Sequence, residues 1–138
     1  MSQENVEIVR AVIAAINRGD LEAAFKHMDS HVELDASRTI GPVHGVFKMD
    51  QIRAALDEFF GLWEAVCIEI DKFIDDGEQI ATAFTSHHRG RDGIEVTVRP
   101  SFVWTIRDGR IVHTRFYQEW QEALEAVGLS EQDAHADS

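Results

Sequence analysis

Residues 94–107 read IEVTVRPSFVWTIR, and this stretch decides the fold. Its apolar side chains lie on one side of a strict alternation, at Val96, Val98, Phe102, Trp104 and Ile106. Alternation with a period of two is typical of a strand with one buried face. Asp108-Gly109 follows, a dipeptide favoured in two-residue hairpin turns because both positions take a positive φ there. We therefore predict a hairpin whose second strand runs from Arg110 to Glu119.

A further strand is predicted upstream, over 78–89, and Gly90-Arg91-Asp92-Gly93 joins it to Ile94. The three strands then form an antiparallel meander over 78–120. Residues paired across a hairpin share a face. Pairing Arg89 with Ile94 therefore turns His87 toward the buried face and His88 toward solvent.

Helical patterns gather in the first half of the chain. Apolar residues recur at helical spacing over 6–16, 21–28 and 49–63, and a short helix is predicted over 119–127. Strands are expected over 32–36 and 65–74. Helices that come early and strands that come late indicate an α+β fold, a curved antiparallel sheet wrapped around three N-terminal helices with a short C-terminal helix. We predict one domain over 1–129 and an acidic, flexible tail over 130–138.

Composition narrows the function classes. The 138 residues have a net charge of -12, which disfavours nucleic acid or an anionic membrane as a partner. A single cysteine, Cys67, excludes an internal disulfide and suits the cytoplasm, where we expect the protein to reside. Neighbouring His87 and His88 point to opposite faces of a strand, so they cannot chelate one metal ion. We expect neither a metal nor another cofactor.

Several short motifs resemble the NTF2-like superfamily, and its SnoaL-like group most of all. They are Asn17 to Ala23 between the first helices, Pro42-Val43-His44-Gly45 before the third, Trp104 to Ile111 in the last hairpin, and Tyr117 followed by Glu122 to Leu129. The resemblance implies a cone-shaped half-barrel, an apolar pocket between sheet and helices, and a homodimer. Members include isomerases, polyketide cyclases, epoxide hydrolases and dehydratases, so the fold alone does not select a reaction.

The catalytic groups of those relatives are not kept here. The positions that match the tyrosine, base and oxyanion aspartate of ketosteroid isomerases look like Val12, Ala36 and Phe102. The positions that match the Asp, Arg and Asp of limonene-type epoxide hydrolases look like Thr85, Ala83 and Phe116. The acid that SnoaL-type cyclases carry on the last strand also corresponds to Phe116. Asp35 lies one residue from the base position, so a one-residue shift would restore a carboxylate.

Strict pairing around Asp108-Gly109 sends His113 and Arg115 toward the cone, whereas the family resemblance implies Thr114, Phe116 and Gln118 there. A β-bulge between Ile111 and Thr114 would reconcile the two, and we favour the second set because an inward, unpaired Arg115 would be costly. The predicted ligand-binding lining is then apolar with few polar groups. It comprises Val12, Trp63, Thr85, Val98, Phe102, Trp104, Phe116 and Gln118, with Ile16 and Ala83 beside them. An exposed sheet face with Phe84, Val103 and Thr105 is the expected dimer interface.

His87 is the first candidate for a catalytic residue and Asp35 the second, because a histidine works as acid or base near neutral pH. The alternative is that His87 is a polar anchor bonded to Gln118 or Thr85. We predict a small-molecule-binding protein, with isomerisation, cyclisation or dehydration of a carbonyl, polyketide-like or steroid-like compound as its possible reaction. The competing hypothesis is a dimer whose pocket is filled by its own side chains and which acts through protein association.

Overall fold

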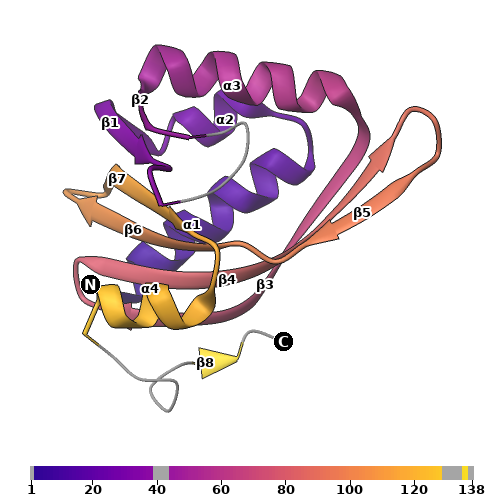
Figure 1. Ribbon diagram of the computed structural model, residues 1–138. Coiled ribbons are helices and arrows are strands. Elements are labelled where there is room, and N and C mark those ends of the chain that lie inside the picture. The colour runs from indigo at the N-terminus through magenta and orange to yellow at the C-terminus, as the bar shows by residue number, and fades with distance from the viewer. Residues whose placement is uncertain (1, 39–43, 129–134, 137–138) are drawn as a thin grey trace.

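The computed structural model describes residues 2–38, 44–128 and 135–136, and Figure 1 shows its ribbon. The elements follow in the order α1 (Ser2–Asn17), α2 (Leu21–Phe25), β1 (Met28–Asp35), β2 (Val46–Lys48), α3 (Met49–Leu62), β3 (Trp63–Asp76), β4 (Gln79–Gly90), β5 (Glu95–Val98), β6 (Ser101–Arg107), β7 (Arg110–Tyr117), α4 (Trp120–Ala126) and β8 (His135–Ala136).

The strands form one curved, unclosed sheet in the order β2-β1-β7-β6-β4-β3-β8, and β5 pairs with β4 beyond the end of β6. In Figure 1, helices α1, α2 and α3 lie on the concave side of this sheet and α4 lies on the other side. The prediction of an α+β half-barrel around three N-terminal helices is confirmed. One detail differs, because β1 and β7 run parallel while the other pairs are antiparallel.

The core fills the space between α1, α2 and the concave face. Val9 and Val12 of α1 meet Ile80 of β4 and Ile111 of β7 there, and each is at most 1% exposed. A smaller cluster lies on the opposite face, where Leu124 of α4 covers Ala81, Val103 and Tyr117. Two layers of apolar packing therefore hold the sheet, one on each face.

The hairpin that joins β6 and β7 follows the sequence prediction. Arg107 pairs with Arg110, and the two turn residues Asp108 and Gly109 have φ of 52° and 75°. The predicted bulge is also present. Thr105 pairs with His113 but Ile106 pairs with Ile111, so Val112 is the extra residue. Thr114 and Phe116 consequently lie opposite Trp104 and Phe102.

The turn between β4 and β5 differs from the prediction, and the difference inverts a strand. The Gly90 N–H donates to the Ile94 carbonyl at 2.7 Å, and the Gly93 N–H to the Gly90 carbonyl at 2.9 Å. Gly93 has a φ of +88°, which suits a three-residue loop that closes with a left-handed residue. Arg89 consequently pairs with Glu95, not with Ile94. A shift of one residue exchanges the two faces of a strand, so the predicted inward direction of His87 was wrong.

Inverting β4 also changes the expected dimer face. Phe84 is 2% exposed and belongs to the core on the concave side. Val103 is 4% exposed on the opposite face, in the cluster with α4. The prediction that Phe84 and Val103 share an exposed face was therefore wrong, because β4 has the other parity and α4 covers part of that face.

Two predicted segments fall largely outside the described residues. Of the motif over 42–45, Pro42 and Val43 lie outside them. Of the predicted tail, 130–134 and 137–138 also lie outside, while His135 and Ala136 form β8 and pair with Phe73 and Lys72 of β3. None of the helices described here is long and apolar enough to cross a membrane.

Candidate functional site

Aromatic rings fill the centre of the concave face. Phe102 lies 4.8 Å from Phe116 and 5.5 Å from Phe84 between ring centroids, and Phe84 lies 6.3 Å from Trp104. The Trp104 Nε1–H donates to Thr82 Oγ1 at 2.9 Å, which satisfies the indole inside the core. Val12, Phe102, Trp104 and Phe116 thus lie on the predicted face. Their role as ligand contacts stays a prediction.

Little free space accompanies these rings. A gap between α1 and strands β3 and β4, bordered by Val9, Ile80 and Thr82 among others, measures about 10 Å³. That volume is close to the minimum for a single water molecule. An open depression of about 640 Å³ lies between the start of α1 and the two hairpin turns. It is lined by turn backbone and by the exposed Glu78–Arg107 ion pair, with few apolar side chains.

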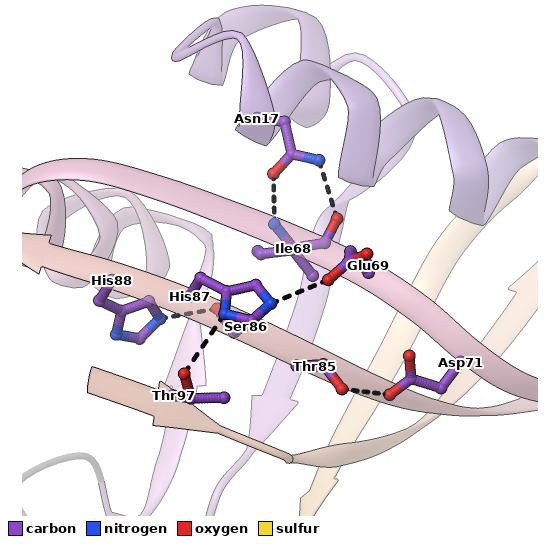
Figure 2. Close-up of polar contacts among 9 residues, drawn as sticks. All are labelled: Asn17, Ile68, Glu69, Asp71, Thr85, Ser86, His87, His88 and Thr97. Carbon is purple, nitrogen blue, oxygen red and sulfur yellow. Dashed lines mark hydrogen bonds and ion pairs between the residues drawn. The ribbon is translucent and has the colours of Figure 1, made fainter. Parts of the chain in front are cut away.

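A buried polar pair marks the far end of the concave face. Ser86 and His88, two residues apart on β4, share the inner side of the strand and are 4% and 7% exposed. The Ser86 hydroxyl oxygen lies 2.6 Å from His88 Nε2. Figure 2 shows His88 directed toward Ser86, with His87 on the other side of the strand. We call Ser86 and His88 the inner dyad.

Aromatic rings surround the imidazole of the inner dyad. The ring of His88 lies 4.9 Å from that of Trp63 and 5.1 Å from that of Phe59, centroid to centroid. These rings come together because α3 ends at Leu62 and the chain turns directly into β3 at Trp63. Trp63, predicted as a lining residue, therefore lies beside the inner dyad.

Burial lowers the pKa of His88 below its ordinary value of 6.5, and the neighbouring charge of His87 lowers this pKa further. Desolvation disfavours the charged imidazolium, so the ring is neutral at physiological pH. A neutral imidazole both accepts and donates a proton, and Ser86 occupies one of its nitrogens. The inner dyad is thus a hydroxyl and an imidazole ready to exchange a proton.

Apolar side chains remain exposed next to the inner dyad. Val96 pairs with His88 and Val98 pairs with Ser86, so both valines lie on the same side of the sheet as the inner dyad. They are 38% and 40% exposed, and Leu62 at the end of α3 is 65% exposed. Val98 was predicted as a lining residue. It has the predicted parity but lies on the projecting β4–β5 hairpin, outside the cone.

His87 forms a different network on the outer face. Its Nε2 lies 2.9 Å from Glu69 Oε1 and its Nδ1 lies 3.3 Å from Thr97 Oγ1, while half of its side chain is exposed. Thr85, on the same face, bonds to Asp71, as Figure 2 shows. The predicted inward positions of His87, Thr85 and Ala83 were therefore wrong, because the loop before β5 is one residue shorter than assumed.

Two further predicted residues lie away from the cone. Gln118 is exposed after the end of β7. Asp35 lies on the outer side of β1, where Ser37 donates both its hydroxyl and its N–H to Asp35 Oδ1, at 2.5 and 2.9 Å. Arg115 Nε lies 3.4 Å from Asp35 Oδ2. The Ser37 bonds and Arg115 hold the pKa of Asp35 below its ordinary value, so this carboxylate serves an ion pair and not the concave face.

The described part of the chain contains no group of three or more His, Cys, Asp or Glu residues able to hold a metal ion. Of the adjacent histidines, His88 and not His87 lies on the inner face. The signal that would have corrected the prediction for His87 is Gly93, because glycine at the third position of a three-residue hairpin loop is preferred.

The SnoaL-like domain family matches residues 9–114, which is most of the chain. The chain belongs to the SnoaL-like domain family. This SnoaL-like domain matches no curated protein.

Solved structures share the NTF2-like fold of this SnoaL-like domain. TerC, co-crystallised with polyporic acid, is 20% identical with a TM-score of 0.74, and the match covers 90% of this chain and 98% of TerC. AclR from Streptomyces galilaeus is 14% identical with a TM-score of 0.76, covering 93% and 98% of the two chains. A protein with a ketosteroid isomerase-like fold from Catenulispora acidiphila, in complex with trimethylamine, is 17% identical with a TM-score of 0.70, covering 90% and 94%. Such low identities establish the fold alone.

Proposed function

We propose that this SnoaL-like domain binds a small, largely apolar carbonyl compound beside the inner dyad and transfers a proton on it without a cofactor. The observation that supports the proposal is the 2.6 Å contact between Ser86 and a buried His88 amid aromatic rings. Half-buried Phe59 and Trp63 and the exposed Val96 and Val98 offer apolar surface for the ligand. Small-ligand sites commonly combine such surface with a few polar groups.

Proton transfer follows from the state of the imidazole. A ligand hydroxyl or an acidic C–H next to Ser86 can pass its proton through the hydroxyl to His88 Nε2. The apolar surroundings disfavour the imidazolium that results, so His88 returns the proton readily to another ligand atom. Taking a proton from one atom and returning it to another is the chemistry of isomerisation, cyclisation and dehydration.

The neighbouring histidines provide a matched test. Wild-type protein is screened by thermal shift against steroid, polyketide-like and terpenoid ketones, because a ligand that binds the native state raises the melting temperature. We expect a hit whose shift is lost in His88→Gln and reduced in Ser86→Ala. His87→Gln removes a histidine from the opposite face and should leave the shift unchanged.

Two results would reject the proposal. One is the absence of any shift, and the other is a shift that His87→Gln abolishes while His88→Gln does not. Circular dichroism of each variant without ligand establishes that a lost shift does not come from unfolding. For a confirmed ligand, exchange of its acidic proton with deuterium from solvent then reports catalysis directly.

One observation favours a second function. The concave face is densely filled, since Val12, Ile80 and Ile111 have no exposed surface and the adjoining gap measures about 10 Å³. A filled cone suits a protein that acts through association with other chains, and we keep this as the second candidate. Under it, the thermal-shift screen yields no ligand. We place the protein in the cytoplasm under either function, where its single exposed Cys67 stays reduced.

A further inference from the structure

Strand β5 is an open edge of the sheet. Among the described strands it pairs with β4 alone, and Figure 1 shows the β4–β5 hairpin extending beyond the body of the molecule. Its apolar side chains stay accessible, with Ile94 61% exposed and Val96 and Val98 close to 40%. Open edges that carry apolar residues are templates for another strand.

The hydrogen-bond pattern fixes which backbone groups face outward. The Gly90 N–H bonds to the Ile94 carbonyl, and the Phe84 N–H bonds to the Pro100 carbonyl. Even-numbered residues of this segment therefore direct their backbone groups toward β4. Alternation along an antiparallel strand then directs the N–H and C=O of Glu95, Thr97 and Arg99 toward the open edge.

The segment Glu95 to Arg99 is self-complementary: two copies of it can pair with each other. When a second β5 approaches antiparallel with Thr97 opposite Thr97, Glu95 of each copy lies opposite Arg99 of the other. The outward backbone groups of Glu95, Thr97 and Arg99 meet in bonded pairs in this register. Val96 lies opposite Val98 of the second copy, so the apolar side chains of both strands adjoin and form one strip on the inner face.

We propose that a second copy of this chain pairs with β5 across a two-fold axis at Thr97, which joins the two sheets edge to edge. A two-fold interface places the same residues on both sides, as this register does. Opposite charges directly across a strand pair stabilise it and like charges destabilise it. The charge pattern of 95–99 favours this register. A shift by one residue on each strand would set Glu95 opposite Thr97 and lose the opposite-charge pair with Arg99.

The pairing also joins the polar networks of the outer face. Thr97 accepts or donates a bond to His87 at 3.3 Å, and His87 contacts Glu69 at 2.9 Å. With Thr97 at the axis, the chain Glu69–His87–Thr97 drawn in Figure 2 meets its copy there. On the inner face, Val98 of the second copy lies beside Val96 and next to the inner dyad.

Sedimentation equilibrium with charge-swap variants tests the pairing. Wild-type chain should have about twice its monomer mass of 15.6 kDa. Glu95→Arg and Arg99→Glu each bring like charges together twice across the axis, so each should weaken the dimer about tenfold or more. The double variant restores opposite charges and should return the dissociation constant to within about threefold of wild type. The contact of Glu95 with Arg89 within one chain, at 3.8 Å, is lost equally in Glu95→Arg and in the double variant, so it cannot cause the recovery.

Cross-linking provides a geometric readout that does not depend on affinity. In a Cys67→Ser background, Thr97→Cys places two thiols across the axis, where the Cα separation of a bonded pair, about 5.5 Å, lies within disulfide range. Mild oxidation should link the dimer. Glu58→Cys on the exposed side of α3 is the control and should stay unlinked. A monomeric wild type, a dimer insensitive to both charge reversals, or a double variant weaker than the single variants would overturn the pairing. Ligand binding at His88 has its own readout, the thermal-shift comparison of His88→Gln with His87→Gln, so failure of the pairing and failure of ligand binding are distinguishable.

Discussion

Replacing Asn17 tests how the last residue of α1 holds the strand next to the inner dyad. Its side chain forms two hydrogen bonds with one backbone unit of β3. Asn17 Nδ2 donates to the Ile68 carbonyl at 2.9 Å, and the Ile68 N–H donates to Asn17 Oδ1 at 2.8 Å, as Figure 2 shows. Ile68 lies opposite Ser86, whose backbone faces β5, so the groups of Ile68 point away from β4. The amide thus bonds the edge of β3 as a neighbouring strand would.

The magnitude follows from the two bonds. Each contributes about 0.5–1.5 kcal/mol net, so Asn17→Ala removes about 2 kcal/mol. The higher helix propensity of alanine offsets up to about 0.5 kcal/mol of this loss in the free energy of unfolding. The free energy of unfolding should therefore fall by about 1.5 kcal/mol. With an unfolding entropy near 2.1 cal/mol/K per residue for 138 residues, the melting temperature should fall by about 5 °C.

Urea unfolding and calorimetry measure these two quantities, and amide hydrogen exchange at Ile68 reports the contact itself. Asn17→Asp is an informative partner, because it keeps the acceptor for the Ile68 N–H and loses the donor to the carbonyl. Arg18→Ala, in the exposed turn that follows this helix, should change the free energy of unfolding by less than about 0.5 kcal/mol. If Asn17→Ala costs less than about 0.5 kcal/mol and Ile68 exchange is unchanged, the reasoning about the β3 edge is refuted.

Three more changes test other parts of the structure. The lowered pKa of Asp35 stabilises the fold above pH 3.8, and this stabilisation is lost as pH falls through the folded-state pKa. Asp35→Asn should hence lower the free energy of unfolding by about 1 kcal/mol near neutral pH and leave it almost unchanged in acid, as measured by urea unfolding at a series of pH values. The lowered pKa of His88 acts in the same direction at higher pH, because the unfolded chain binds the proton more readily and the free energy of unfolding falls as pH drops below 6.5. His88→Gln should flatten that dependence, and an NMR titration of His88 with a pKa at or above 6.5 would contradict it. A Cβ at Gly93 would have no neighbouring atom within 4 Å, but the φ of +88° is unfavourable for alanine. Gly93→Ala should therefore lower the free energy of unfolding by about 1–2 kcal/mol through backbone strain alone. An unchanged melting temperature would argue against the left-handed loop.

Local patterns in the sequence predicted much of this fold. Alternation over 94–107 and the Asp108-Gly109 turn identify the β6–β7 hairpin because side-chain period and turn chemistry depend only on nearby residues. Helix spacing likewise located α1 and α3. The bulge at Val112 did not follow from local pattern, because strict pairing sends His113 and Arg115 inward; the family resemblance and the cost of an inward, unpaired Arg115 favoured the register that the structure has.

Which side chains reach the inner dyad's position depends on the length of the loop between β4 and β5, and local sequence pattern does not determine that length. Gly90 to Gly93 can close as a three-residue or a four-residue connection, and both are common. The choice decides whether His87 or His88 meets the aromatic rings of α3. Sequence reasoning correctly assigned a histidine to the inner face and named the wrong one, since a single residue of register inverts a whole strand. The networks of Asn17 with Ile68 and of Glu69 with His87 join segments distant in sequence, and no local signal predicts them.

The parallel pairing of β1 with β7 has a consequence for how the chain folds. Leu34 lies beside Thr114, so two strands about 80 residues apart in sequence pair inside the sheet, one strand from its β2 edge. Contacts of this separation form slowly because a long segment must close first. During synthesis, α1, α2 and β1 emerge from the ribosome well before β7 exists to join them to the meander. We therefore expect the amino-terminal third to stay incompletely packed, and open to chaperones, until the last strand has been made.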